Sequence, residues 1–139
     1  MKILVICLMG TLLFAGCKKD NAVKSLKNEI AGKWELVRAN SGWGGMQEFS
    51  PGNGNTISFT GSSYSQRVSY NDTTFNFNGG YTIYTGKPCD FAAEITLINL
   101  SSVDGLGYPQ EIKLDNDELS IGATECIADG GTNFYRKIE

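Results

Sequence analysis

Apolar and polar residues alternate along most of the chain beyond residue 32, and this period of two predicts β-strands. The predicted strands are 34–38, 56–60, 64–70, 80–85, 92–100, 111–114, 118–121 and 133–138. Turn-forming residues separate them, most clearly Asp115-Asn116-Asp117 within a hairpin. Residues 71–78 are ambiguous, because Asn78-Gly79-Gly80 could turn a ninth strand back on itself.

A different period precedes the first strand. Val23, Leu26 and Ile30 lie three and four residues apart, and Gly32 follows at a C-cap position. This pattern predicts a short helix from Val23 to Ala31. With about eight strands and no helical segment between them, the fold class is all-β, either an antiparallel sandwich or an up-and-down barrel.

The first residues have the pattern of a secretory signal. Lys2 supplies a positive charge, residues 3–14 are almost all apolar, and the small residues Ala15 and Gly16 follow. The apolar stretch is shorter than the roughly 20 residues that a helix needs to span a bilayer. Residues 1–16 are therefore predicted to be a signal peptide.

The end of this segment, Leu13-Phe14-Ala15-Gly16-Cys17, resembles the lipobox of bacterial lipoproteins. The resemblance implies that Cys17 is acylated, for example with palmitate, and becomes the mature N-terminus. Residues 17–22 are then a polar tether, and 23–139 form the domain. No Asp follows Cys17, which favours the outer membrane and leaves the periplasmic or surface-exposed leaflet open.

The cysteines change the picture further. If Cys7 leaves with the signal and Cys17 takes the lipid, Cys89 and Cys126 remain in an oxidising compartment. We predict a disulfide between them; the alternative is two separate buried thiols. Closing a loop of about 37 residues stabilises a fold by roughly 4 kcal/mol.

Charge and composition exclude several function classes. The net charge of −3 with no basic cluster argues against a nucleic-acid partner. The chain has no histidine, the commonest catalytic base and metal ligand. Asp115-Asn116-Asp117-Glu118 lacks the spacing of a calcium loop. We therefore expect no catalytic residues, no metal and no cofactor.

Gly32-Lys33-Trp34, at the start of the first strand, resembles the Gly-x-Trp motif of lipocalins, and Arg136 lies at the matching place in the last strand. The resemblance implies an eight-stranded antiparallel up-and-down barrel with a short N-terminal helix. It also implies that Trp34 packs across the closed end with Arg136 over its ring. Because a later motif of the family is missing, the chain is most similar to the lipocalin-like domains of lipoproteins from Gram-negative bacteria.

Two groups of residues are candidates for ligand contact. The long segment 40–55 carries Trp43, Met46 and Phe49, and the corresponding loop of lipocalins is a lid over the barrel mouth. These three side chains either meet a ligand or pack the loop down. The second group is the strand aromatics, which either line a cavity or fill the barrel: Phe59, Tyr64, Tyr70, Tyr81 and Phe134.

These observations predict a monomeric, membrane-tethered lipocalin-like protein that is not an enzyme and binds a small apolar or amphipathic molecule. Trp43, Met46, Phe49, Phe59, Tyr64 and Tyr81 are its predicted ligand-binding residues. The alternative is a filled barrel whose surface binds an envelope protein or a glycan. The two hypotheses differ in whether the barrel encloses a cavity.

Overall fold

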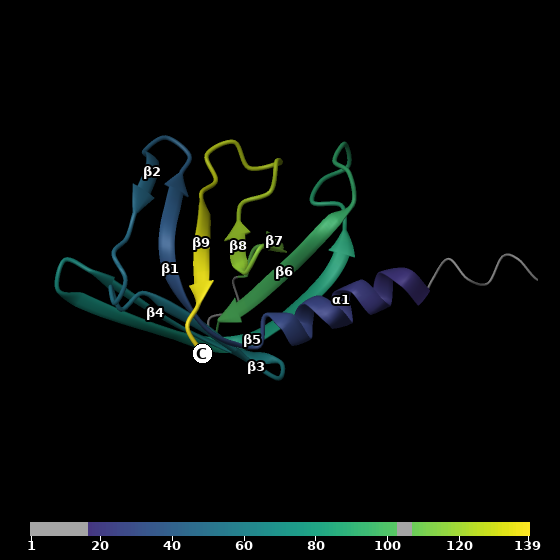
Figure 1. The fold of residues 1–139 in the computed structure, drawn as a ribbon. Helices are drawn as coiled ribbons and strands as arrows, with labels where there is room; N and C mark the ends of the chain where they lie inside the picture. The colour runs from purple at the N-terminus through teal and green to yellow at the C-terminus, as the bar shows by residue number, and fades with distance from the viewer. Residues whose placement is uncertain (1–16, 103–106) are drawn as a thin grey trace, which may run out of the picture.

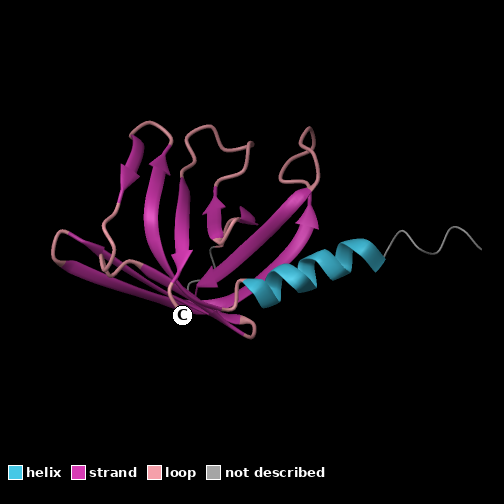
Figure 2. Ribbon diagram, viewed as in Figure 1, coloured by secondary structure: helices cyan, strands magenta, loops and turns pink. Residues whose placement is uncertain are grey.

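The computed structural model describes residues 17–102 and 107–139. Its elements are α1 (Cys17–Glu29), β1 (Gly32–Ser41), β2 (Gly45–Glu48), β3 (Thr56–Thr60), β4 (Ser63–Tyr70), β5 (Thr73–Gly86), β6 (Ile95–Ser102), β7 (Gln110–Asp115), β8 (Glu118–Gly122) and β9 (Thr132–Lys137) (Figure 1). Strands make up more than half of the described residues and one helix precedes them (Figure 2). The predicted all-β class with a short N-terminal helix is confirmed.

The strands form one closed barrel. The described residues give a nine-stranded antiparallel sheet in the order β2-β1-β3-β4-β5-β6-β7-β8-β9, and β1 also pairs with β9. This last pairing closes all strands except β2 into an eight-stranded up-and-down barrel. Neighbours in the barrel are consecutive in sequence apart from β2, so the predicted topology is confirmed.

The ninth strand lies in the segment that was predicted to be a lid. The first half of β1 pairs with β3, whereas Arg38 to Ser41 pair with the four residues of β2. Turn residues 42–44 connect these two strands. All four residues of β2 are exposed, and such a short, fully exposed strand has no alternation to detect.

The long strand β5 corrects the prediction for residues 71–80. The chain turns at Asn71-Asp72, both with positive φ, and then continues without a break through Gly79. Gly79 and Gly80 pair with β4 on one edge and with β6 on the other. A Cβ atom on Gly79 would lie 1.9 Å from the Ser101 carbonyl oxygen. The glycines therefore allow a close strand approach and do not form a turn.

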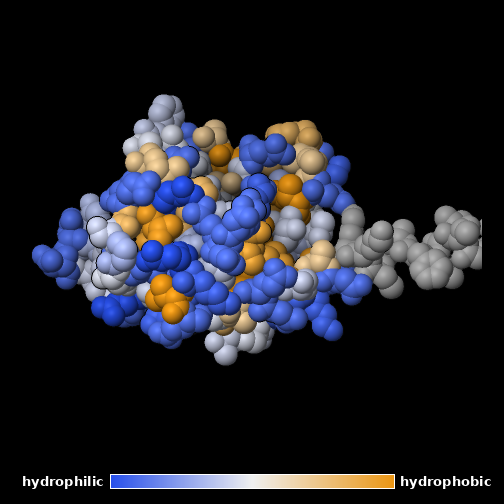
Figure 3. All heavy atoms as spheres, in the orientation of Figure 1, coloured by the Kyte–Doolittle hydropathy of each residue, from blue (hydrophilic) through white to orange (hydrophobic). Residues whose placement is uncertain are grey.

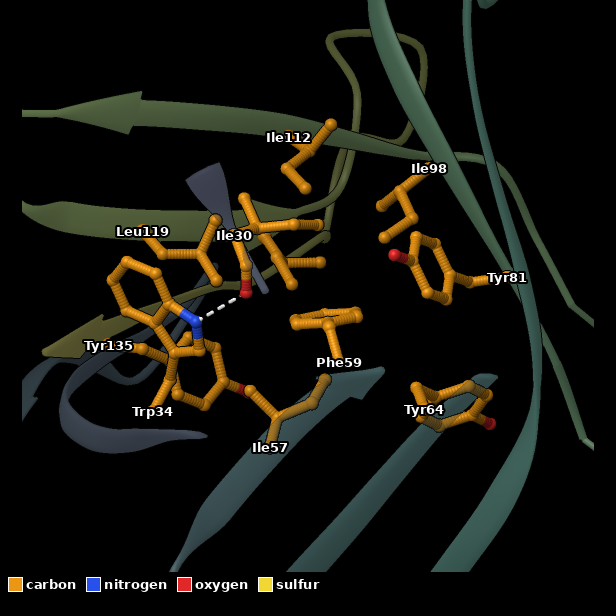
Figure 4. Close-up of a cluster of buried hydrophobic side chains, with 11 residues drawn as sticks. Ile30, Trp34, Ile57, Phe59, Tyr64, Tyr81, Ile98, Ile112, Leu119 and Tyr135 are labelled. Carbon is orange, nitrogen blue, oxygen red and sulfur yellow. Dashed lines mark hydrogen bonds between the residues drawn. The ribbon is translucent and has the colours of Figure 1, made fainter. Parts of the chain in front are cut away.

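The closed end of the barrel, called the base below, is filled by a hydrophobic core. Its members come from the residue that follows α1 and from all eight barrel strands: Ile30, Trp34, Ile57, Phe59, Tyr64, Tyr81, Ile98, Ile112, Leu119, Ile121 and Tyr135 (Figure 4). The indole nitrogen of Trp34 donates a 2.8 Å hydrogen bond to the Ile30 carbonyl. Gly32 has a φ of +120°, and a Cβ atom there would lie 2.3 Å from the Glu139 carbonyl oxygen. The packing therefore requires a glycine at position 32 and places Trp34 in the base, as the Gly32-Lys33-Trp34 motif predicts.

A disulfide crosses the weakest part of the barrel wall. The described residues of β6 and β7 form two register pairs, against eight between β5 and β6. Cys89, after β5, is bonded to Cys126, after β8, with their Cα atoms 6.2 Å apart. The predicted disulfide is confirmed, and it ties together the loops on either side of the β6–β7 seam.

Helix α1 begins earlier than the apolar pattern predicts. Residues 17–22, predicted as a tether, belong to the helix. Residues 20–22 are exposed, and apolar periodicity cannot detect turns without a buried face. Leu26 packs against the core, and Lys137 Nζ donates a 3.2 Å hydrogen bond to the Glu29 carbonyl. The predicted signal peptide, residues 1–16, lies outside the described residues.

Candidate ligand-binding site

A cavity of about 440 Å³ that is open to solvent lies near the end of the barrel opposite the base, and it is here called the mouth cavity. Tyr64 and Gln66 of β4 and Phe77 of β5 form one wall. Leu100 of β6, Gln110 of β7 and residues 107–109 between them form the opposite wall. Ala123, Ile127, Gly130 and Gly131 complete the lining from the loop between β8 and β9.

A smaller hollow of about 190 Å³, here called the side hollow, lies where β1 leaves β3 to pair with β2. Its lining includes Leu36 of β1, Phe49, Val68 of β4 and Tyr135 of β9. Gln66 lines both the mouth cavity and the side hollow. Its side chain therefore separates the two spaces.

A neutral polar cluster lies beside this partition. Burial raises the pKa of the Tyr135 hydroxyl to about 12, and side-chain hydrogen bonds with Asn133 and Gln66 oppose that shift. Burial also raises the pKa of Tyr64. Both phenols are therefore protonated at physiological pH. The cluster offers hydroxyl and amide groups without a formal charge.

Glycines and the disulfide hold the mouth loop close to its neighbours. A Cβ atom on Gly131 would lie 2.5 Å from the Asn40 carbonyl oxygen, and one on Gly130 would lie 1.8 Å from the Ala123 Cβ atom. Cys126 anchors the same loop to Cys89. The wall formed by Ala123 and Ile127 is therefore fixed by packing and by a covalent bond.

The structure divides the predicted strand aromatics between core and cavity. Phe59 and Tyr81 are buried in the base in an edge-to-face contact with ring centroids 5.0 Å apart (Figure 4). Neither lines the mouth cavity or the side hollow. Tyr64 belongs to the core and also lines the mouth cavity. Tyr70 is exposed.

The residues predicted to form a lid lie apart from the mouth cavity. Trp43 is 88% exposed at the turn between β1 and β2, and it lines a surface hollow with Asp129. Met46 is 53% exposed on β2. Phe49 is half-buried and lines the side hollow. The hairpin of β1 and β2 extends the sheet along the barrel wall, which explains why these side chains do not fold over the mouth.

The cation above Trp34 is Lys137 and not Arg136. Lys137 Nζ lies 5.4 Å from the Trp34 ring centroid, and these two residues are register partners. Arg136 instead forms a 3.0 Å ion pair with Glu35, whose other carboxylate oxygen accepts a 2.7 Å hydrogen bond from the Gly52 amide. The predicted contact of Arg136 is therefore wrong, although the motif closes the base as expected.

Phe134 faces away from the barrel interior. A bulge in β1 between Leu36 and Arg38 shifts the register, so that Arg38 lies opposite Phe134. The Arg38 guanidinium lies 4.6 Å from the Phe134 ring centroid and forms an ion pair with Glu118. Phe134 thus stabilises the outer surface and does not line the cavity.

Of the residues that line the mouth cavity, the sequence identified only Tyr64 as a ligand contact; those it missed include Gln66, Phe77, Tyr108 and Ile127. The period of two puts Gln66 on the same strand face as Tyr64, but a polar residue was not among the predicted ligand contacts. Phe77 fell in the ambiguous segment 71–78. Tyr108 and Ile127 lie in connections, where periodicity gives no direction.

Other site types lack support within residues 17–102 and 107–139. No group of three or more Cys, Asp or Glu side chains gathers there to hold a metal ion. None of the described helices is long and apolar enough to cross a bilayer. On the face shown in Figure 3, apolar residues are interspersed with hydrophilic ones. The mouth cavity is therefore the candidate functional site.

No protein-family model and no curated protein sequence matches the chain. Among solved structures, it is similar to the crystal structure of a lipocalin-like protein from Bacteroides uniformis, with a TM-score of 0.56 and 17% sequence identity. The match covers 79% of this chain and 99% of that protein's chain. The chain therefore has a lipocalin-like barrel fold, as the resemblance of its Gly32-Lys33-Trp34 motif predicts.

Proposed function

We propose that this protein binds a small apolar or amphipathic molecule in the mouth cavity. The observation that carries the proposal is the cavity itself, about 440 Å³ in volume and lined by aromatic, aliphatic and a few neutral polar side chains. Ligand pockets have volumes of roughly 300–1,000 Å³ and this kind of lining. The absence of histidine from the chain favours binding over catalysis.

The filled base limits where a ligand can lie. Phe59 and Trp34 are each 1% exposed and pack with Ile57 across the closed end. Truncation of such buried aromatic side chains destabilises a fold by about 3–5 kcal/mol, so we do not expect a ligand to displace them from the base. The bound molecule therefore occupies the mouth half of the barrel, above Tyr64.

The chain offers a matched set of variants to test this site. Phe77 and Phe75 lie two residues apart on β5 and are 44% and 49% exposed, but Phe77 alone of the two lines the mouth cavity. Tyr108 and Tyr70 form a similar pair, 73% and 69% exposed. Tyr108 lines the cavity and Tyr70 does not. All four truncations remove exposed aromatic surface, so the two double variants differ mainly in location.

The experiment is native mass spectrometry of the purified protein, with organic extraction of any retained molecule. We expect a bound molecule that is lost from Phe77→Ala/Tyr108→Ala and kept by Phe75→Ala/Tyr70→Ala. Loss from both double variants, or from neither, would place the ligand elsewhere. A protein that retains nothing and responds to no hydrophobic probe would overturn the proposal.

That last outcome would favour the second candidate function, an interaction module for an envelope protein or a glycan. The observation in its favour is Trp43, 88% exposed at the tip of the β1–β2 hairpin beside Asp129. Exposed Trp side chains are frequent in the centres of protein interfaces. A Trp43→Ala variant that loses a co-purifying partner, with the mouth cavity empty, would support it.

We also propose that the protein is a monomeric lipoprotein of the outer membrane, acylated at Cys17 after removal of residues 1–16. The sequence Leu13-Phe14-Ala15-Gly16-Cys17 supports this proposal. Since α1 runs for 13 residues from Cys17, the lipid would lie about 20 Å from the barrel base. Labelled palmitate should enter the wild-type protein and not Cys17→Ser, and only the wild type should fractionate with outer membranes.

A further inference from the structure

The mouth cavity has two neutral amides on its inner side, together with Tyr64 and Leu100, and exposed aromatic and aliphatic groups at its rim. Phe77, Tyr108 and Ile127 are exposed and therefore lie toward solvent. Gln66 and Gln110 are half-buried on β4 and β7. No Asp, Glu, Lys or Arg is found among the described residues that line this cavity. A molecule that enters it meets apolar surface first and amide groups below.

This arrangement fixes which end of an amphipathic ligand points inward. An alkyl chain placed against the two glutamines would remove water from their amides without replacing its hydrogen bonds, which costs roughly 1–3 kcal/mol per group. A polar group placed there can pair with the amides, while the apolar part contacts Phe77 and Tyr108. The polar end therefore lies toward Gln66, and the apolar end lies toward the rim.

The charge of that polar end follows from the lining. An ionised carboxylate, sulfonate or ammonium group buried without an opposite charge loses far more hydration than amides return. The phenol of Tyr135, hydrogen-bonded to Gln66, is protonated and supplies no charge either. Uncharged groups such as a hydroxyl, a ketone or an amide can form hydrogen bonds with these partners, and their desolvation costs far less free energy than that of an ion.

We propose that the mouth cavity selects uncharged amphipathic molecules, with the polar group of the ligand hydrogen-bonded to Gln66. This inference rests on the proposed function, because it requires that the mouth cavity is the binding site. It narrows the ligand class and excludes fatty acids and other anionic lipids bound with the head group inside. Gln66 is the specificity-determining residue, since it reaches both the mouth cavity and the polar cluster of Tyr135 and Asn133.

The first test uses the unaltered protein and two fluorescent probes with the same ring systems. N-phenyl-1-naphthylamine is neutral, and 8-anilinonaphthalene-1-sulfonate adds one negative charge. We expect the neutral probe to bind at least about tenfold more tightly at pH 7.5. Equal or tighter binding of the anion would overturn the selectivity while leaving the proposed function standing. Binding of neither probe would overturn both.

The second test locates the polar group. Displacement of the neutral probe by decanol and by decanoate at pH 8 compares two ligands that differ in their head groups. We expect decanol to displace the probe at about tenfold lower concentration. The affinity of decanol for the Gln66→Leu variant should be roughly threefold to tenfold lower than for wild type, which corresponds to the loss of one hydrogen bond. Gln47→Leu, an exposed glutamine on β2, is the control and should match wild type.

Unchanged decanol affinity in a folded Gln66→Leu protein would show that the ligand's polar group lies elsewhere. Folding of this variant is checked by circular dichroism and by retention of the Cys89–Cys126 disulfide. If Gln66→Leu does not fold, the probe comparison on the wild-type protein still decides whether the cavity prefers uncharged molecules.

Discussion

Replacement of both disulfide cysteines should destabilise the barrel by about 4 kcal/mol. Cys89 and Cys126 are 37 residues apart in sequence. In the chain-entropy model, a closed loop of that length lowers the entropy of the unfolded state by about 13 cal/mol/K, or about 4 kcal/mol at 25 °C. For a domain of this size, the loss should lower Tm by roughly 15 °C.

The assay is guanidinium unfolding of wild type and Cys89→Ser/Cys126→Ser, followed by tryptophan fluorescence. Of the two tryptophans, Trp34 is buried and Trp43 is exposed, so the change in emission on unfolding reports mainly on Trp34 in the base. Reduced wild type should unfold like the double variant, and reductant should not change the variant. A loss below about 1 kcal/mol would refute the reasoning, because residual structure or native strain would then cancel the entropy term.

The position of the disulfide predicts a local effect as well. The described residues pair β6 with β7 at two positions, Leu97 with Glu111 and Ile98 with Gln110. Without the crosslink, this seam should open before the rest of the barrel. Hydrogen exchange of the Ile98 and Glu111 amides should therefore speed up more than that of the Trp34 amide. Equal acceleration at all three would show that the disulfide acts on global unfolding alone.

Three further substitutions test the packing. Gly79→Ala should cost about 1–3 kcal/mol because its Cβ atom meets backbone of β6, whereas Gly80→Ala should stay within about 0.5 kcal/mol of wild type in the same urea titration. Trp34→Phe leaves a buried carbonyl unpaired and should cost about 1–3 kcal/mol by denaturation, with the exposed Trp43→Phe unchanged. Burial raises the pKa of Tyr135 from 10.0 to about 12, so the folded state binds more protons between these pH values. Stability should therefore fall as pH rises through that window, by up to about 3 kcal/mol in alkaline unfolding curves, and Tyr135→Phe should flatten that fall.

Much of the fold could be predicted because strands such as β3 and β8 bury alternate residues. On β8, for example, Leu119 and Ile121 are buried and Ser120 is not, and this pattern marks a strand with one buried face. The disulfide followed from cysteine number and compartment. The barrel itself came from the resemblance carried by Gly32-Lys33-Trp34, since alternation alone does not separate a barrel from a sandwich.

The site was harder to predict because strand pairing, and not the local sequence, determines which side chains face the cavity. Trp43 and Met46 have the composition of a lid, but β2 pairs with the edge of β1 and keeps both side chains outside. The sequence leaves the strand of Phe77 ambiguous, because nothing in Asn78-Gly79-Gly80 distinguishes a turn from a close strand contact. That distinction depends on Ser101, which is distant in sequence.

Strand parity explains the misassigned tryptophan contact and also defines the mouth cavity. Neighbouring residues of a strand point to opposite faces, so Lys137 and Arg136 cannot both reach Trp34. Because Trp34 pairs with Lys137, Arg136 lies on the outer face, where it forms an ion pair with Glu35. The same rule makes every second residue of β4 a candidate for the interior, Tyr64 at the core and Gln66 above it. Gln66 is a neutral amide directly above the filled core. The comparison of neutral and anionic probes therefore tests the charge of the ligand most directly, and not its length.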